Sequence, residues 1–469
     1  MEEFRSLCPY SFKQLEYTLL RKLGEAFAQV LAEVLWQYDC LIMERRPERF
    51  QVKQVRSRTI ETLLGVPVVY QRRLYYDREA RRYVYLLDEV LGLEPNETIS
   101  PGLRETVVTL GVECSSYRQA AKALAGIYQH PVVSHETIRR SVIAVGQITA
   151  AAEERQRAIS SGSRRVPMLF LEVDGIYEHL QRDRQKFVEE RVLIGHEGWE
   201  ADGKRRRLRN KITFRSQAAS GEEFWEVASE HLYSLYDLDE QTLVIINGDR
   251  AGWIRQGQKY FPNALYQVDR FHLVREWVRI FGVANKKVLR EIFRVIDKDP
   301  TGQAFLEALE RHRDKVAKEK LGAFDALVND LRPIAECVCD YRVRLRAKGQ
   351  STEGLYGMGA AESQMSCLAD RTKHRRQSWS RVGLASLMQL LCAKLAGKLE
   401  AVIHASKGVL VELAEVEERI EAAKREVVES MREESPGIKQ SHPPILDAGR
   451  GRSGGLARVL FDVAHASSF

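Results

Sequence analysis

Hydrophobic and polar positions alternate with a helical period in some segments of the chain and with a strand period in others. Over residues 11–43, apolar side chains recur three or four positions apart, which predicts one long amphipathic helix that packs in its domain or dimerises. Residues 58–93 are rich in β-branched and aromatic side chains and indicate short antiparallel strands. We therefore expect a small N-terminal domain, residues 1–100, made of a helix and a β-hairpin.

A helical pattern with recognisable cap residues returns over residues 102–147. Pro101 opens a first helix, a serine at 115 or 116 caps a second, and Ser134 caps a third that runs to Val145. Three short helices predict a helix-turn-helix-like DNA-binding region, residues 101–160, although an ordinary helical bundle explains the same pattern. The side chains expected to contact DNA are His135, Arg139 and Arg140.

From residue 166 onward, strand and helix patterns alternate. The expected strands cover residues 166–173, 175–181, 190–196, 207–214, 242–246 and 265–268, with helices at 221–236, from 251 and from 270. Antiparallel strands, a helix, and then strand, helix and strand form the order of an RNase H-like core. In that fold the first and fourth strands lie side by side. We assign residues 161–274 to the first part of this core.

The remaining residues complete an α/β multidomain chain. Residues 275–350 have helical periodicity throughout and predict an all-helical insertion in the RNase H-like core. Residues 351–405 are assigned to the second part of the core. Residues 406–469 are expected to form a charged C-terminal helix, a linker and a partly disordered tail rich in glycine and arginine.

Three carboxylates are candidates for catalysis. Asp174 and Asp249 each follow an apolar run that reads as a buried strand, and Glu362 begins a helical segment. Carboxylates from two strand ends and one helix suit two Mg²⁺ ions, with Mn²⁺ as a substitute, in phosphodiester chemistry. Each aspartate alone is equally explained as a turn residue. Glu353 is the alternative third carboxylate, and Glu172 is a weaker candidate, expected on the other face of its strand.

Further residues accompany these carboxylates. Asp269 and His272 lie at positions i and i+3 of an expected helix and form an accessory pair. The alternative is that Asp269 is only the N-cap of this helix. Basic residues follow Glu362 and are expected to bind DNA phosphates, unless they form a solvated helix face. They are Arg371, Lys373, Arg375 and Arg376.

The composition favours a polyanionic partner in a reducing compartment. The net charge is +7, and residues 204–211 include six basic side chains in eight. The seven cysteines contain no Cys-x-x-Cys pair, which disfavours a zinc ribbon or a disulfide framework. We expect a cytoplasmic, nucleoid-associated bacterial protein without a signal peptide, a membrane span or an ATP-binding phosphate loop.

Four motifs together resemble a known family. They are Val-Asp-Gly at 173–175, Asn-Gly-Asp-Arg-Ala-Gly-Trp-Ile at 247–254, Val-Asp-Arg-Phe-His-Leu at 268–273, and Glu-Ser at 362–363 followed by Arg-x-Lys-x-Arg-Arg-x-Ser-Trp-Ser at 371–380. They are similar to those of bacterial insertion-sequence transposases of the ISLre-two family, related to the Mutator-type transposases. The resemblance covers residues 58–400 and implies a DDE triad of Asp174, Asp249 and Glu362.

The resemblance also implies a reaction and its partners. Such an enzyme binds the double-stranded ends of its element, cleaves them with two metal ions and joins the free 3′-hydroxyl to target DNA. Holding two ends together implies a homodimer or a larger oligomer. Two alternatives remain from the residues themselves: an RNase H-like structure-specific nuclease without strand transfer, and a non-catalytic DNA-binding regulator that uses only residues 102–147.

Overall fold

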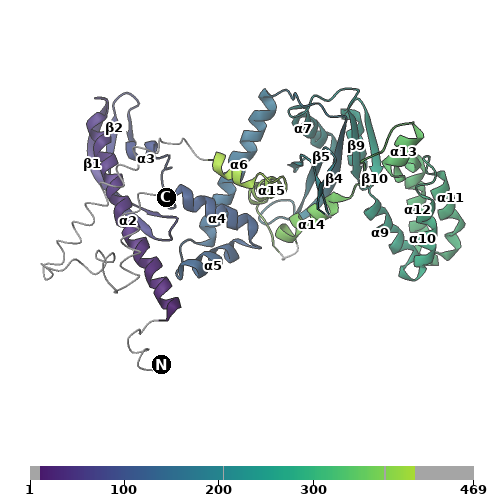
Figure 1. Ribbon diagram of the computed structural model, residues 1–469, viewed down its shortest axis with the longest axis horizontal. Helices are drawn as coiled ribbons and strands as arrows, with labels where there is room; N and C mark the ends of the chain where they lie inside the picture. The colour runs from purple at the N-terminus through teal and green to yellow at the C-terminus, as the bar shows by residue number, and fades with distance from the viewer. Residues whose placement is uncertain (1–10, 204, 374–376, 407–469) are drawn as a thin grey trace. The chain divides into compact units, whose positions relative to one another are not determined.

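The computed structural model describes residues 11–203, 205–373 and 377–406 (Figure 1). The protein is a mixed α/β chain with several sheets, and it divides into two compact units. One unit contains residues 1–141 and 403–469, and the other contains residues 142–402. The predicted C-terminal helix, linker and tail, together with Arg375 and Arg376, lie outside the described residues.

In the first unit, a long helix packs on a three-stranded antiparallel sheet. The helix and the antiparallel pairing are as predicted, but the strands are not short, since β1 (Phe50–Glu61) has 12 residues and begins before the expected start at residue 58. Ser11 and Gln14 form a reciprocal capping box at the start of the helix. The shared core includes Leu35, Ile60 and Tyr70. The elements are α2 (Phe12–Arg45), β1 (Phe50–Glu61), β2 (Pro67–Asp77), β3 (Arg82–Val84) and α3 (Leu86–Val90).

Three capped helices follow: α4 (Pro101–Glu113), α5 (Tyr117–Tyr128) and α6 (His135–Ile159). Ser116 caps α5, and the Ser134 hydroxyl accepts a hydrogen bond from the Thr137 amide. The predicted end of the third helix at Val145 is wrong, because α6 continues through Gly146 to Ile159. In the second unit, a Cβ at Gly146 would lie 2.5 Å from the Ser386 carbonyl oxygen, so this glycine permits a close helix contact.

A five-stranded sheet of order β10-β9-β4-β5-β8 organises the second unit. Its strands are β4 (Met168–His179), β5 (Phe187–His196), β8 (Ile212–Ser216), β9 (Leu243–Gly248) and β10 (Ala264–Val268). β4, β5 and β8 are antiparallel neighbours, whereas β9 runs parallel to both β4 and β10. The expectation that the strands leading to Asp174 and Asp249 lie side by side is confirmed.

Two predicted strand boundaries are wrong. Residues 168–179 form one strand, because Asp174 and Gly175 continue to pair with β5 after pairing with β9 has ended at Val173. Asp174 therefore lies within a strand. The expected strand over residues 207–214 is broken at Asn210, which has a positive φ of 48°. Its first part, β7 (Arg205–Leu208), pairs instead with β6 (Trp199–Asp202) in a separate hairpin.

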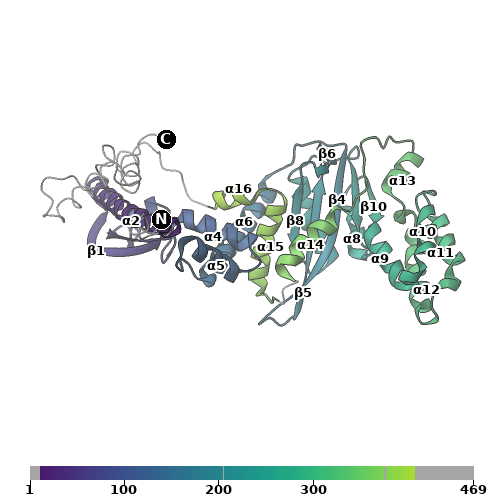
Figure 2. The same ribbon diagram turned by 60° about the horizontal axis from the view of Figure 1, so that its bottom comes forward.

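Helices cover both faces of the five-stranded sheet. The face that carries Leu169, Leu171 and Val173 packs against Phe224 and Trp225 of α7. On the other face, Phe170 shares a small core with Tyr341 of α13 (Tyr341–Ala347), and α14 lies beside β4 (Figure 2). The helices are α7 (Gly221–Tyr233), α8 (Gly252–Arg255), α9 (Arg270–Phe281), α14 (Ala360–Thr372), α15 (Arg381–Leu395) and α16 (Leu399–Ala405).

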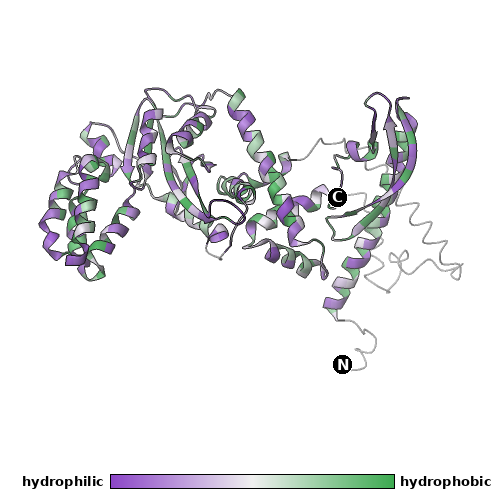
Figure 3. Cartoon of the chain, turned by 180° about the vertical axis from the view of Figure 1, so that it is seen from behind, coloured by the Kyte–Doolittle hydropathy of each residue, from purple (hydrophilic) through white to green (hydrophobic). Residues whose placement is uncertain are grey.

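Within residues 275–350, the structure contains helices and no strand, as predicted. Figure 3 shows hydrophobic and hydrophilic residues interspersed along these helices, and their buried Phe305, Phe324 and Leu331 belong to the same core as the sheet. The helices are α10 (Lys286–Val295), α11 (Gln303–Arg311), α12 (Leu321–Leu331) and α13 (Tyr341–Ala347). Short 3-10 helices cover Gln256–Tyr260, Val283–Asn285, Arg313–Lys315, Lys318–Lys320 and Arg332–Val338.

Candidate active site

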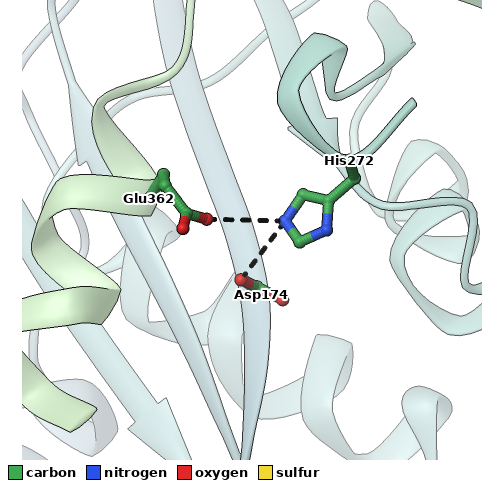
Figure 4. A group of neighbouring side chains, drawn as sticks. All are labelled: Asp174, His272 and Glu362. Atoms are coloured by element: carbon green, nitrogen blue, oxygen red, sulfur yellow. Dashed lines mark ion pairs between the residues drawn. The ribbon is translucent and has the colours of Figure 1, made fainter. Parts of the chain in front are cut away.

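Three of the predicted site residues converge on one point of the second unit (Figure 4). Asp174 comes from β4, His272 from the first turn of α9 and Glu362 from the first turn of α14. One ligand atom of each lies within 4.8 Å of the other two. The His272 Nε2 atom is 3.7 Å from the Asp174 Oδ2 atom and 3.8 Å from the Glu362 Oε2 atom. The described residues contain no other such group of three metal-ligating side chains.

Helix α14 is held against β4 by two buried glutamates. The Glu172 carboxylate accepts hydrogen bonds from the amides of Gly359, Ala360 and Ala361 at 3.1, 3.1 and 2.8 Å. At the other end of the helix, Glu178 accepts a bond of 2.6 Å from the Thr372 hydroxyl. The helix has no N-terminal side-chain cap of its own, so Glu172 supplies the negative charge that its first turn favours.

The expected orientation of Glu172 is wrong. Positions two apart in a strand share a face, so Glu172, Asp174 and Glu178 all point toward α14. Glu362 lies between the two attachment points and therefore meets Asp174. Glu172 is the residue whose importance the sequence reasoning missed, although the strand alternation alone indicates that it shares a face with Asp174.

Asp269 does not join the group of ligands. Its Oδ1 atom accepts bonds from the Phe271 and His272 amides at 2.8 and 3.2 Å, and its Oδ2 atom accepts one from the Asn247 side chain at 2.8 Å. The side chain is buried and acts as the N-cap of α9. Asp269 therefore fixes the helix turn that presents His272, and of the predicted accessory pair only the histidine reaches the cluster.

Asp249 lies next to the cluster but outside the group of three. It follows β9 directly, where a Cβ at Gly248 would come within 2.6 Å of the Val173 carbonyl oxygen, so only glycine allows this close approach of the strands. The Asp249 Oδ1 atom accepts a bond of 2.8 Å from the Ala251 amide. Asp249 and His272 line an adjoining cavity of about 390 Å³ together with Arg275 of α9.

The electrostatics of the cluster favour a bound cation. The pKa of Asp174 is raised from 3.8 to about 6, chiefly by burial and to a smaller extent by the nearby charges of Asp249 and Glu362. The Gly175 amide, which donates a bond of 2.8 Å to Asp174, and the charge of His272 act in the opposite direction. A divalent cation stabilises the anionic form of a carboxylate, such as Asp174, whose pKa is raised by burial and by nearby negative charges.

This pKa predicts a pH dependence of stability in metal-free solution. The folded-state pKa of Asp174, about 6, lies above its ordinary value of 3.8, so the folded state keeps this proton longer than the unfolded state. The resulting destabilisation is absent below pH 3.8 and complete above pH 6. We expect the free energy of unfolding to lose up to ~3 kcal/mol from this group over that interval. Urea unfolding with a chelator at several pH values measures this change, and identical profiles for the wild type and Asp174→Asn would refute it.

The other predicted residues occupy different environments. Glu353 is exposed and is not among the clustered carboxylates. Arg371 is only 5% exposed, and its guanidinium lies 5.4 Å from the centre of the buried Trp379 ring. Lys373 is exposed. The structure therefore presents Lys373, but not Arg371, to solvent on the segment that follows Glu362.

In the first unit, the three residues expected to read DNA lie in the first two turns of α6. His135 and Arg140 are exposed, and Arg139 is half-buried. Glu136 accepts hydrogen bonds from Arg139 at 2.7 and 2.8 Å and from Arg140 at 3.2 Å. These hydrogen bonds lower the pKa of Glu136, and those from Arg139 have the largest effect. The carboxylate offsets part of the positive charge that this helix carries.

The fold and the site define a mixed α/β protein whose central sheet carries an acidic, histidine-containing cluster suited to a cation. The profile described as "Uncharacterised protein family (UPF0236)" matches residues 9–407, so the chain belongs to this family. No helix among the described residues combines the length and the apolar character that a membrane crossing requires.

Relatives with the same family name occur in two bacteria. A UPF0236 protein of Caldanaerobacter subterraneus subsp. tengcongensis is 26% identical over 308 residues, which cover 65% of this chain and 62% of the relative. The chain thus spans about three fifths of that protein's length. The "UPF0236 protein in vanSb 3′region" of Streptococcus gallolyticus is 26% identical over 399 residues, 82% of this chain and 84% of the relative.

One solved structure aligns weakly with the chain. It is titled "Drosophila P element transposase strand transfer complex" and has a TM-score of 0.23 and 11% sequence identity. The alignment covers 82% of this chain and 96% of that chain.

Proposed function

We propose that this chain is a DNA transposase of an insertion sequence, related to the ISLre-two and Mutator-type families, with Asp174, Asp249 and Glu362 as its DDE triad. The observation that carries the proposal is the meeting of Asp174 and Glu362 with His272 within 4.8 Å. The sheet order β10-β9-β4-β5-β8, with three antiparallel and two parallel strands, supports an RNase H-like core interrupted by the helices of residues 275–350.

The donor set fits a hard divalent cation. Asp174, Glu362 and the adjacent Asp249 would hold Mg²⁺ or Mn²⁺, since Mg²⁺ prefers one or two carboxylates together with substrate phosphates. When bound, such ions activate water and stabilise charge on the attacking and leaving oxygens of a phosphodiester. His272 would either complete the ligand set or donate a hydrogen bond to a phosphate oxygen. Its place in the first turn of α9 is fixed by Asp269.

The names of the relatives favour a mobile element over a stand-alone nuclease. The name of one Caldanaerobacter relative joins eleven locus designations, and the name of another joins four. A protein that recurs at many loci of one genome is what a self-propagating element leaves behind. We therefore favour transposition over structure-specific cleavage as the proposed activity. The proposed partner is duplex DNA in the nucleoid, and the proposed active form is a homodimer or a larger oligomer.

A joining assay tests this proposal against its alternatives. The purified chain is incubated with Mg²⁺, a target plasmid and a labelled duplex that carries the DNA flanking its gene. We expect strand cleavage at a fixed position and joining of a pre-cleaved 3′-hydroxyl end to the plasmid. Cleavage without joining would instead identify a nuclease. Binding without either reaction would identify a DNA-binding regulator.

A further inference from the structure

A second, strongly basic cavity lies on the second unit beside the candidate active site. Its volume is about 1090 Å³. One wall is the β6–β7 hairpin, another is the start of α14, and a third is the turn that follows α15. This cavity is separate from the smaller one that Asp249 and His272 line, because no residue that the structure describes lines both.

The cavity concentrates positive charge. Among the side chains that the structure describes, five basic ones and no aspartate or glutamate line it: Arg206, Arg207, Lys211, Arg342 and Lys398. Asp340 balances the charge of Arg342 through two hydrogen bonds of 2.8 and 2.7 Å. Lys211 donates a bond of 3.2 Å to the side chain of Gln364, which is neutral, so this bond does not offset the lysine charge. The cavity therefore favours an anion.

Aromatic side chains hold part of this charge in place. The Arg206 guanidinium lies 3.6 Å from the centre of the Tyr356 ring, which in turn packs edge-on against Trp199 at 5.7 Å. Stacking on an aromatic ring limits the freedom of an arginine without neutralising its charge. Arg206 and Lys398 are exposed and line the cavity from different elements.

Helix α14 connects this cavity to the acidic cluster. Ala360, Ser363 and Gln364 line the cavity, whereas Glu362 from the same turn of the helix meets Asp174 and His272. An α-helix with its side chains is about 10–12 Å across, so a polymer in the cavity lies roughly one helix diameter from the cluster. A small anion would need convergent buried donors, whereas Arg206 and Lys398 are exposed and come from different elements.

We propose that this cavity, formed by the β6–β7 hairpin, the start of α14 and the turn after α15, binds the phosphate backbone of the duplex DNA that enters the acidic cluster. The inference rests on the proposed function, because it assumes that the cluster acts on DNA. Basic side chains on separate walls would each neutralise a phosphate and fix the direction of the strand across α14. The β6–β7 hairpin is then a DNA-positioning element.

The test compares two pairs of charge-removing substitutions in the full chain. Arg206→Gln with Lys398→Gln removes two exposed charges from the cavity, and Lys287→Gln with Arg290→Gln removes two exposed charges from α10. Binding of a labelled duplex is measured by fluorescence anisotropy over a range of salt concentrations. Each lost phosphate contact lowers the slope of log K against log salt by ~0.9, so the cavity pair should lower it by ~1.8. At 0.1 M salt the affinity should fall on the order of 10- to 100-fold.

Further variants separate this inference from the proposed function. Arg206→Lys with Lys398→Arg keeps both charges and should retain the wild-type slope, which distinguishes charge from a packing defect. Equal slopes for the cavity pair, the α10 pair and the wild type, with wild-type cleavage and joining intact, would overturn the cavity assignment alone. Equal losses of binding affinity and salt slope in the cavity pair and the α10 pair would also overturn it, because the effect would then depend on net charge and not on where the charges lie. A wild-type chain that neither binds nor cleaves DNA would overturn the proposed function as well.

Discussion

Asp174→Asn is expected to abolish DNA cleavage by this chain while leaving DNA binding intact. The amide has the shape of the carboxylate but lacks the charge that the cluster needs to hold a divalent cation. The loss of a group that stabilises charge in the transition state typically lowers a rate by about 10²–10³-fold, and the loss of a metal ligand should reach at least ~10³-fold. Asp249→Asn and Glu362→Gln are expected to behave in the same way.

The measurement is the initial rate of strand cleavage with Mg²⁺, beside duplex binding by anisotropy. Asp314→Asn is the matched control, because Asp314 is an exposed aspartate in the helical insertion that pairs only with its neighbour Lys315 among the described contacts. The loss of activity cannot be assigned to unfolding, since burial raises the pKa of Asp174 and its neutral replacement should stabilise the metal-free fold. Cleavage by Asp174→Asn at the wild-type rate would remove Asp174 from the triad.

Local patterns predict the parts of this fold that depend on local physics. Apolar runs gave the strands that precede Asp174 and Asp249, and serine caps gave the starts of the helices, because both follow from neighbouring residues. The Asp-Gly pair at 174–175 predicts two separate strands, because such a pair usually marks a turn. Here the continuous pairing with β5, a long-range contact, overrides that preference.

The site depends even more on long-range contacts. The position of Glu362 follows from the hydrogen bonds between Glu172 and the amides of Gly359 and Ala361, which lie 187 and 189 positions later in the chain. Local periodicity cannot reveal such bonds. Likewise, a run of basic residues indicates a charged helix but not which side chains reach solvent. Arg371 packs over Trp379, whereas the basic residues at 206–207 line a cavity. The residue types of the candidate site are thus visible in the sequence, but their distances are not.

Glu172→Gln should reveal how much of the activity depends on the placement of α14. The glutamine keeps the volume of the side chain but replaces one acceptor oxygen with an NH₂ group facing the amides of Gly359 and Ala361. The amides of Gly359 and Ala361 then both lack an acceptor, which costs ~1–3 kcal/mol of folding free energy for each, and the favourable charge at the helix terminus is lost. We expect cleavage to fall about 10–100-fold, the usual effect of removing a group that orients a metal ligand.

Glu178→Gln is the matched control for this positioning role. Glu178 lies on the same strand and the same face, is equally buried at 1% exposure, and touches the other end of α14 through the Thr372 hydroxyl. Its glutamine can still accept that bond, so the activity should change little. The Mg²⁺ concentration that gives half-maximal cleavage is measured at a temperature where both variants are folded. Displacement of Glu362 should raise this concentration, whereas a general loss of stability should not. If both variants show the same magnesium dependence and the same rate, α14 is not positioned by Glu172, and the contact between Asp174 and Glu362 depends on the packing of the helix alone.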